Sequence, residues 1–278
     1  MQSKTFLITG VSTGLGRAIG EVALKAGHKV VGTVRNAEAK NEFEKLKPGA
    51  AFTKILDVTE EEAVLRMVSE IESEIGAIDI LVNNAGYGHE GIIEESPLSE
   101  LRRQFEVNVF GAVSVIKAVL PFMRKRRSGH IINVTSVGGL MTFPGVGYYH
   151  GSKFALEGIS GALAKEVKGF GIFVTALEPG SFRTDWAGRS MTRTERSIPD
   201  YDKIMDPLRQ TRQQRSGKQP GNPLLAGEAI LKLIASPNPP TRLLIGNDAI
   251  TNVQKALAEH AKEIEDWASI TRSTDFAE

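Results

Sequence analysis

The stretch 9-TGVSTGLGRAIG-20 decides the fold predicted for this chain. It joins an apolar run that fits a buried strand to a segment with apolar side chains at helical spacing. Glycines at such a junction allow a tight turn and the close approach of a phosphate, which the helix N-terminus binds through its free N–H groups. The GxxxGxG spacing therefore predicts a dinucleotide-binding loop made of Gly10, Ser12, Thr13, Gly14, Leu15 and Gly16. The alternative is a glycine-rich turn without a ligand.

The alternation of strand and helix continues along the chain and predicts an α/β fold. Short β-branched runs predict strands at Thr5–Thr9, Lys29–Val34, Ala51–Leu56, Ile78–Val82, His130–Val134, Phe173–Leu177 and Arg242–Ile245. Amphipathic runs predict helices near Leu15–Ala26, Glu60–Ile75, Leu101–Lys125, Lys153–Lys168, Gly227–Ala235 and Asn252–Trp267. Crossover connections of this kind give a parallel sheet with helices on both faces, and ligands bind beyond the carboxyl ends of its strands. The residues that follow each strand are therefore the candidates for the site.

Composition limits the classes of function. The chain has 278 residues, 41% of them hydrophobic, and a formal net charge of +1, which fits one large domain and argues against nucleic acid as the main partner. It has no cysteine and five scattered histidines, so neither disulfides nor a transition-metal site are expected. The most apolar long window, 105–123, contains Glu106, Asn108 and Lys117, and no signal-peptide core is apparent. We expect a soluble, cytoplasmic protein without a membrane span.

The ends of the second, third and fourth strands indicate which dinucleotide binds. An acidic residue after the second strand would bond the ribose of NAD, whereas this chain has Arg35, which can form bidentate bonds to the 2′-phosphate of NADPH. A solvated arginine is the alternative. Asp57 could accept a hydrogen bond from adenine, or cap the next helix. In 83-NNAG-86, the residues Asn84, Ala85 and Gly86 are expected to border the cofactor, although such a turn also serves a purely structural role.

Two further polar residues lie where chemistry is expected. Asn108 interrupts an otherwise apolar helix, where it either caps a kink or organises a water molecule. Ser136 follows the fifth strand in 130-HIINVTSVGG-139, and no GxSxG elbow is present there. Ser136 is therefore interpreted as a hydrogen-bond donor to a substrate carbonyl rather than as a nucleophile.

The stretch 148-YYHGSK-153 contains the candidate acid–base residue. Tyr149 and Lys153 are four residues apart and share one face of a helix. Tyr148 is five residues from Lys153 and lies roughly 140° away around the helix axis, so Tyr149 is the predicted partner of the lysine. A nearby ammonium and a cationic nicotinamide would lower the phenol pKa from near 10; a shift of about three units requires roughly 4 kcal/mol.

A polar segment follows the sixth strand. In 178-EPGSFRT-184 a Pro-Gly turn precedes Thr184, which is placed to meet the nicotinamide carboxamide. The segment 181–223 is only weakly periodic, so we expect a long loop that closes over the site as a lid. Its excess of basic residues could meet an acidic substrate or carrier, or could simply be solvated. Tyr148 and Trp186 could contact an apolar substrate there, or could be packing residues.

Taken together, TGVSTGLG, NNAG, Asn108, Ser136, Tyr149-x-x-x-Lys153 and PGSFRT resemble the short-chain dehydrogenase/reductase family, and in particular its hydroxysteroid and retinol dehydrogenase-like members. The resemblance spans nearly the whole chain, from Thr5 to about Ile245. It implies a single Rossmann-like, doubly wound domain over 1–278, with a lid at 181–223 and a C-terminal helix and tail at 248–278. It also implies a homodimer or homotetramer built on the two long helices.

The resemblance assigns roles to residues. Asn108, Ser136, Tyr149 and Lys153 form the implied catalytic set, with Ser136, Tyr148, Tyr149 and Trp186 facing the substrate. Lys153 would hold the nicotinamide ribose, and Asn108 would position a water molecule that relays protons. NADP(H) is the preferred cofactor and NAD(H) the alternative; the preference rests on Arg35 because Thr13 replaces the basic residue that NADPH-using members often carry. Beyond the glycine loop, the implied cofactor contacts are Arg35, Asp57, Val58, Asn84, Ala85, Gly86, Thr135, Tyr149, Lys153, Pro179, Gly180, Phe182 and Thr184.

These features predict an NADPH-dependent oxidoreductase that acts on the carbonyl or secondary alcohol of a hydrophobic substrate, such as a ketone, steroid or retinoid. One alternative is a 3-oxoacyl reductase that depends on a carrier protein. A second alternative is a regulator that binds NADPH without catalysis, against which the intact Ser136, Tyr149 and Lys153 argue.

Overall fold

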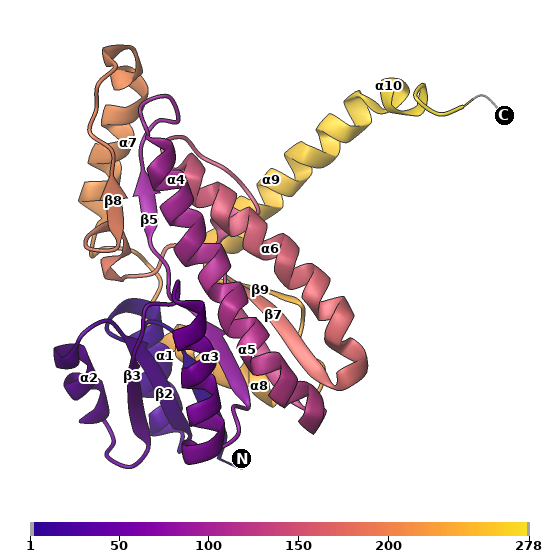
Figure 1. The fold of residues 1–278 in the computed structure, drawn as a ribbon. Helices are drawn as coiled ribbons and strands as arrows, with labels where there is room; N and C mark the ends of the chain where they lie inside the picture. The colour runs from indigo at the N-terminus through magenta and orange to yellow at the C-terminus, as the bar shows by residue number, and fades with distance from the viewer. Residues whose placement is uncertain (1–2, 277–278) are drawn as a thin grey trace.

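Seven parallel strands form the central sheet of the protein, in the order β3-β2-β1-β4-β6-β7-β9 (Figure 1). The computed structural model describes residues 3–276, so the ends of the expected 1–278 domain and 248–278 tail lie outside the described residues. The order of the strands reverses between β1 and β4, and a crevice at the carboxyl ends of the strands is expected at such a point. The strands are β1 Thr5–Ile8, β2 Lys29–Val34, β3 Ala51–Ile55, β4 Ile80–Asn83, β6 Gly129–Val134, β7 Ile172–Pro179 and β9 Arg242–Ile245.

Helices cover both faces of this sheet, which confirms the predicted Rossmann-like α/β fold (Figure 1). The helices are α1 Gly14–Lys25, α2 Ala37–Glu44, α3 Glu61–Glu70, α4 Leu98–Phe105, α5 Gly111–Arg126, α6 Gly147–Val167, α7 Asp202–Arg215, α8 Pro223–Ala235, α9 Asn247–Asp266 and α10 Ala268–Arg272. Helix α6 begins six residues before the predicted start, so both tyrosines lie in its first turn. Helix α2, which was not predicted, is capped by Asn36, whose side chain accepts a hydrogen bond from the Ala39 N–H.

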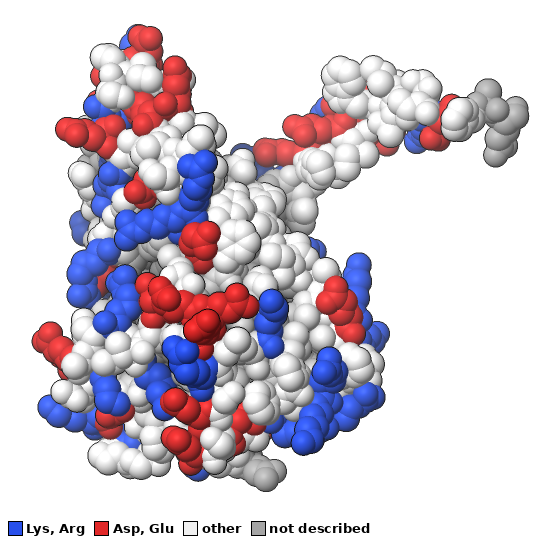
Figure 2. All heavy atoms as spheres, in the orientation of Figure 1, with Lys and Arg blue, Asp and Glu red and all other residues white. Residues whose placement is uncertain are grey.

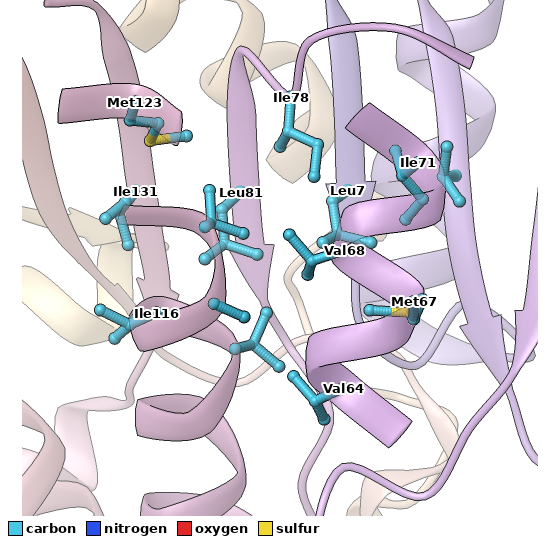
Figure 3. Close-up of a cluster of buried hydrophobic side chains, with 14 of the residues drawn as sticks. Leu7, Val64, Met67, Val68, Ile71, Ile78, Leu81, Ile116, Met123 and Ile131 are labelled. Atoms are coloured by element: carbon cyan, nitrogen blue, oxygen red, sulfur yellow. The ribbon is translucent and has the colours of Figure 1, made fainter. Parts of the chain in front are cut away.

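Alternation along the strands divides the core into two layers. Leu7 of β1 packs in the layer made with α3, α5 and α6, where Val68 and Met123 are also buried (Figure 3). Phe6 and Ile8 point to the opposite face and pack with α1 and α8. Because both faces are covered, the sheet is held rigidly and its carboxyl edge is a fixed platform for a site.

The long apolar helix of the sequence is a core element. The stretch Leu98–Arg126 is long and apolar enough to cross a membrane by length and composition, with a mean hydropathy of 1.5 in its most apolar window. Val115, Val119 and Met123 from this stretch are buried against the sheet, which explains their apolar character. A π-helical turn at Glu106–Phe110 separates α4 from α5 and contains Asn108.

The segment 181–223 is folded, contrary to the expectation of a long loop. It contains strand β8 (Met191–Arg193), which pairs in parallel with β5 (Gly88–Glu90), and helix α7. These elements form a lobe that stands above the sheet (Figure 1), and basic and acidic side chains are mixed over the visible face of the protein (Figure 2).

Two buried carboxylates, Glu90 and Glu95, hold the segment 181–223 against the stretch of chain at and after β5. Glu90 of β5 pairs with Arg209 at 3.0 Å and with Arg212 at 2.8 Å. Glu95 accepts hydrogen bonds from Arg196 at 2.9 Å and from the backbone N–H of Ile198 at 2.8 Å. Arg196, Arg209 and Arg212 therefore have ionic partners within the protein. Their positive charges need neither an acidic substrate nor bulk solvent to balance them.

Helix α9 leaves the body as an arm (Figure 1). At its base the Asp248 carboxylate accepts a hydrogen bond from the Ser181 N–H at 2.8 Å, and Ala249 and Val253 are buried. Further along, Leu257 and Ile264 are exposed. The arm thus anchors the start of the 181–223 segment and then extends beyond the packed core.

Candidate active site

Three glycines form a cradle between β1 and α1. Gly10 and Gly14 have φ of 75° and 64°, a region that favours glycine. A Cβ atom on Gly16 would lie 2.2 Å from the Gly10 carbonyl oxygen and 2.3 Å from the Asn84 side chain. The crowding at Gly16 comes from the protein itself, so only glycine lets α1 begin this close to the Gly10 carbonyl and Asn84. The three glycines thus form the tight turn and helix N-terminus that a pyrophosphate-binding loop requires.

Asn84 holds this cradle in place. Its amide nitrogen donates to the carbonyl oxygens of Thr9 and Gly10, both at 2.9 Å. The Thr9 hydroxyl in turn accepts hydrogen bonds from the N–H groups of Asn84 and Ala85, at 3.0 and 2.9 Å. The structure thus brings together the predicted glycine loop and the predicted NNAG turn, and it gives the side chain of Asn84 a structural role.

The residues expected at the adenine end lie further along the same edge. Arg35 is exposed immediately after β2. Asp57 follows β3, and its Oδ1 accepts hydrogen bonds from the Thr59 N–H at 3.0 Å and from the Thr59 hydroxyl at 2.8 Å. This contact orders the turn before α3, but Asp57 does not cap the helix as the structural alternative expected, because the N-cap position is Glu60. Val58 is buried against Gly111.

Asn108 links the π-helical turn to two other segments. Its Oδ1 accepts from the Tyr87 N–H at 3.1 Å, and its Nδ2 donates to the Tyr87 carbonyl at 3.0 Å and to the Ser152 hydroxyl at 3.1 Å. The buried amide is therefore satisfied within the protein. Because Ser152 precedes Lys153 on α6, Asn108 fixes the helix turn that carries the predicted catalytic pair.

Ser136, Tyr149 and Lys153 come together as predicted. The Tyr149 phenol is hydrogen-bonded to Ser136. The Lys153 ammonium lies 5.8 Å from the centre of the Tyr149 ring and donates to the Val134 carbonyl oxygen at 2.9 Å. Both side chains are buried, with exposed fractions of 7% for Tyr149 and 6% for Lys153. A hydroxyl, a phenol and an ammonium thus converge at the carboxyl end of β6.

The direction of the tyrosine pKa differs from the prediction. Burial raises the pKa of Tyr149 to about 12, although the hydrogen bond from Ser136 opposes this shift. Burial also lowers the pKa of Lys153 to about 8, against the attraction of Glu157. In this structure removal from water dominates, and the ammonium is directed at the Val134 carbonyl. The lowering of the phenol pKa by Lys153 together with a cationic nicotinamide stays a prediction.

The two neighbouring tyrosines have separate environments, in agreement with helical spacing. The Tyr148 hydroxyl donates to the Ser96 carbonyl at 2.8 Å, and its ring stacks on His89 with centroids 5.2 Å apart. Trp186, in contrast, lies beside the reactive residue, with its ring centroid 5.1 Å from that of Tyr149. Of the two aromatic candidates for substrate contact, Trp186 adjoins the catalytic group and Tyr148 packs inside the protein.

The segment that follows strand β7 lies next to the glycine loop. The side chain of Thr184 lies 3.7 Å from the Cβ position of Gly14, and its hydroxyl accepts from the Trp186 N–H at 3.3 Å. The Thr135 hydroxyl donates to the Leu177 carbonyl at 3.0 Å. A Cβ on Gly180, which follows Pro179, would lie 2.4 Å from Asp248, and Phe182 packs in the core layer of α1 and α8. Only Thr184 among these contacts the cradle directly.

Sequence reasoning missed several residues that shape this site. Glu90 and Glu95 carry no motif, and their role depends on arginines far along the chain. Glu178 is buried beside Glu157, and burial raises its pKa to about 8, with Glu157 adding to the shift. His150, the residue after Tyr149, belongs to no motif either. No local signal in the sequence singles out these four residues.

The chain is similar to known proteins over most of its length. A family model described as short chain dehydrogenase matches residues 4–195. The chain belongs to the short-chain dehydrogenase family. A crystal structure of a short-chain dehydrogenase from Streptomyces avermitilis superimposes with a TM-score of 0.92, at 39% identity and 99% coverage of both chains.

Two further short-chain dehydrogenase comparisons bear on the chemistry. The chain is 39% identical over 249 residues to the 3-ketodihydrosphingosine reductase of Bacteroides thetaiotaomicron, covering 88% of this chain and 89% of that protein. A structure of ElxO with NADP bound has a TM-score of 0.75 and 26% identity, and the match covers 90% of this chain and 100% of that chain. The protein is an NAD(P)-dependent oxidoreductase that acts on a small molecule.

Proposed function

We propose that this short-chain dehydrogenase uses NADPH to reduce the carbonyl group of a hydrophobic ketone, or to oxidise the corresponding secondary alcohol. The observation that carries the proposal is the hydrogen-bonded pair of Ser136 and Tyr149 next to Lys153, on the same sheet edge as the glycine cradle. A hydroxyl donor and a protonated phenol together suit a carbonyl oxygen that becomes an alkoxide. Nothing in this set suits acyl or phosphoryl transfer better.

The glycine cradle and its surroundings fit a nicotinamide dinucleotide. The positive φ of Gly10 and Gly14 and the close packing at Gly16 form the tight turn that would bring the N-terminus of α1 to the pyrophosphate. Thr184 would meet the carboxamide and Lys153 the ribose next to the nicotinamide. When bound, the nicotinamide supplies or accepts the hydride.

The protein's own residues supply the proton. With its pKa raised to about 12 by burial, Tyr149 stays protonated at neutral pH and can act as the acid in the reductive direction. Ser136 Oγ accepts a hydrogen bond from the Gly138 N–H at 3.0 Å, so its own hydrogen is directed to another acceptor. Burial lowers the pKa of Lys153 to about 8, which is close to neutral pH. Its ammonium can therefore return a proton to Tyr149 at little cost in free energy.

Preference for NADP(H) over NAD(H) is supported by two observations. Arg35 is exposed beyond β2, where a 2′-phosphate would lie, and no acidic residue takes its place in 34-VRNA-37. A 26% identical structure carries bound NADP. Asp57, Val58 and the other predicted cofactor contacts remain part of this proposal.

The 181–223 segment is proposed as the substrate lid. It places Trp186 against Tyr149, and four of its arginines (Arg193, Arg196, Arg209 and Arg212) face Glu90 or Glu95, which supports an apolar substrate. The likeness to a 3-ketodihydrosphingosine reductase supports a long-chain ketone, with steroids and retinoids as further candidates. The carrier-linked 3-oxoacyl reductase remains the alternative function. A cytoplasmic homodimer or homotetramer remains a prediction.

The test is a panel of hydrophobic ketones and alcohols, assayed by nicotinamide absorbance with each cofactor. Tyr149→Phe should lower kcat by about two orders of magnitude or more, as expected when a general acid is lost. Tyr148→Phe is the matched control: it loses one buried hydrogen bond, worth about 1 kcal/mol of stability, and should keep near-wild-type kcat. Equal damage in both variants, or a near-wild-type rate in Tyr149→Phe, would contradict the catalytic assignment. Retention of biological activity by Tyr149→Phe would favour the regulatory alternative.

A further inference from the structure

His150 is buried next to Tyr149 on α6, with an exposed fraction of 3%. Both of its ring nitrogens have partners. Nε2 accepts a hydrogen bond from the Phe143 N–H at 3.1 Å, and Nδ1 lies 2.7 Å from the Gly138 carbonyl oxygen. One imidazole therefore bridges both ends of the segment 138–143 and ties that segment to the helix that carries Tyr149 and Lys153.

These contacts determine the tautomer. A backbone N–H can only donate, so Nε2 must be the unprotonated nitrogen, and Nδ1 must carry the hydrogen that it donates to Gly138. Burial lowers the pKa of His150, and the positive charge of Arg212 on α7 acts in the same direction. The lowered pKa is consistent with the neutral ring that the two hydrogen bonds require.

Gly138 connects this histidine to the substrate site. Its carbonyl accepts from His150, and its N–H donates to Ser136 Oγ at 3.0 Å. A Cβ on Gly138 would lie 3.0 Å from His150 Nδ1 and 3.2 Å from the Tyr149 ring, so the peptide is held tightly between them. The Gly138 carbonyl belongs to the 138–139 peptide and the Gly138 N–H to the 137–138 peptide. Both lie in the single 3-10 turn Val137–Gly139, which the Gly139 N–H closes on the Ser136 carbonyl oxygen at 2.8 Å. Fixing the carbonyl therefore also holds the N–H that occupies one lone pair of Ser136 Oγ, and so limits the direction of the Ser136 hydrogen.

We propose that His150 is a positioning residue that aims the Ser136 hydroxyl at the substrate carbonyl by clamping the Gly138 peptide to α6. The inference rests on the proposed function of Ser136 as a carbonyl donor. His150 touches neither the predicted substrate position nor the glycine cradle, and its effect reaches the reaction only through Ser136.

Three variants separate the two contacts of the ring. His150→Asn keeps an amide nitrogen at the position of Nδ1 and should retain most of kcat/KM. His150→Gln moves its amide one carbon further, loses the Gly138 contact, and should behave like His150→Leu. The last two should lower kcat/KM about tenfold or more, since small misplacements of a positioned group have effects of this size. The dissociation constant for NADPH, measured by fluorescence, should not change.

A double-mutant cycle with Ser136→Ala is the decisive measurement, because coupled residues do not add. In the Ser136→Ala background, His150→Leu should cause no further loss of kcat/KM. A further tenfold loss, a matching loss of NADPH affinity, or wild-type activity of His150→Leu would each overturn the proposal. Thermal unfolding of each variant reports whether it is folded.

A spectroscopic readout keeps the test independent of turnover. In spectra of protein labelled with ¹⁵N-histidine, the His150 resonance is identified as the one that is present in the wild type and missing in His150→Asn. The wild-type resonance should be that of a neutral ring protonated at Nδ1. A ring protonated at Nε2, or one that is charged at neutral pH, would overturn the clamp. A wild-type protein that shows the Nδ1–H ring but reduces no ketone would refute the proposed function and leave the clamp standing.

Discussion

Replacing Glu90 by glutamine should loosen the 181–223 segment while leaving the seven-stranded sheet intact. The Glu90 side chain is 1% exposed and faces Arg209 at 3.0 Å and Arg212 at 2.8 Å. These arginines also donate to the carbonyl oxygens of Thr194 and Pro144, so the carboxylate sits at the centre of the contact between β5 and α7. Glutamine keeps the size of the side chain but removes its charge.

The size of the effect follows from burial. Removing one partner of a fully buried ion pair costs about 3–5 kcal/mol. The two arginines are 23% and 18% exposed, so water compensates part of their charge. We therefore expect a loss of about 2 kcal/mol in the free energy that holds the segment closed, which raises its open population about thirtyfold.

Limited trypsin digestion measures this population, because cleavage follows the open state when opening is fast. Arg209 and Arg212 are mostly covered while the segment is closed, with exposed fractions of 23% and 18%, and they become cleavage sites when it opens. Cleavage of Glu90→Gln should be about thirtyfold faster than that of the wild type, with a higher KM for the ketone and an unchanged NADPH dissociation constant. Glu94→Gln is the control, since Glu94 is exposed and contacts the Tyr201 hydroxyl at 2.6 Å. Wild-type cleavage of Glu90→Gln, or equal acceleration in both variants, would refute the reasoning.

Two further predictions concern the cofactor and the sheet. Arg35→Ala should raise KM for NADPH roughly ten- to hundredfold, the size expected for a lost charged hydrogen bond, and leave KM for NADH nearly unchanged; equal effects on both cofactors would contradict the assignment of the 2′-phosphate. Burial lowers the pKa of His130 from 6.5 to about 4 in the folded protein, so its contribution to stability is complete above about pH 6.5 and falls by up to about 3 kcal/mol as the pH drops toward 4. His130→Gln should flatten that part of the stability curve measured by urea unfolding between pH 7 and 4, and an unchanged slope would show that another group titrates.

The sheet was predictable because its signals are local. Runs such as Lys29–Val34 and Arg242–Ile245 are apolar or β-branched, and both strands match the structure at each end. The spacing of Tyr149 and Lys153 likewise placed them on one helix face. The start of α6 was missed because Gly147 and Gly151 weaken the local helix signal, which packing overrides.

The rest depends on partners that are distant in the sequence. Helix α7 reads as polar and weakly periodic because its arginines are satisfied by Glu90, which lies 119 residues before Arg209. The pKa of Tyr149 could not be predicted from its spacing to Lys153, since burial decides the direction of the shift. Ser136 was correctly chosen, but the Gly138 peptide that orients it is held by a histidine without any motif.

The small β5–β8 sheet has a consequence for the order of folding. His89 and Thr194, whose side chains meet at 2.8 Å, are 105 residues apart in the chain. Contacts between such distant residues carry a large loop-closure entropy, and they become favourable only when nearer contacts have already shortened the loop. The βαβ units of the central sheet supply that shortening. We therefore expect the β5–β8 pair to form after the central sheet. A newly made chain would then bind the dinucleotide before it can bind a substrate.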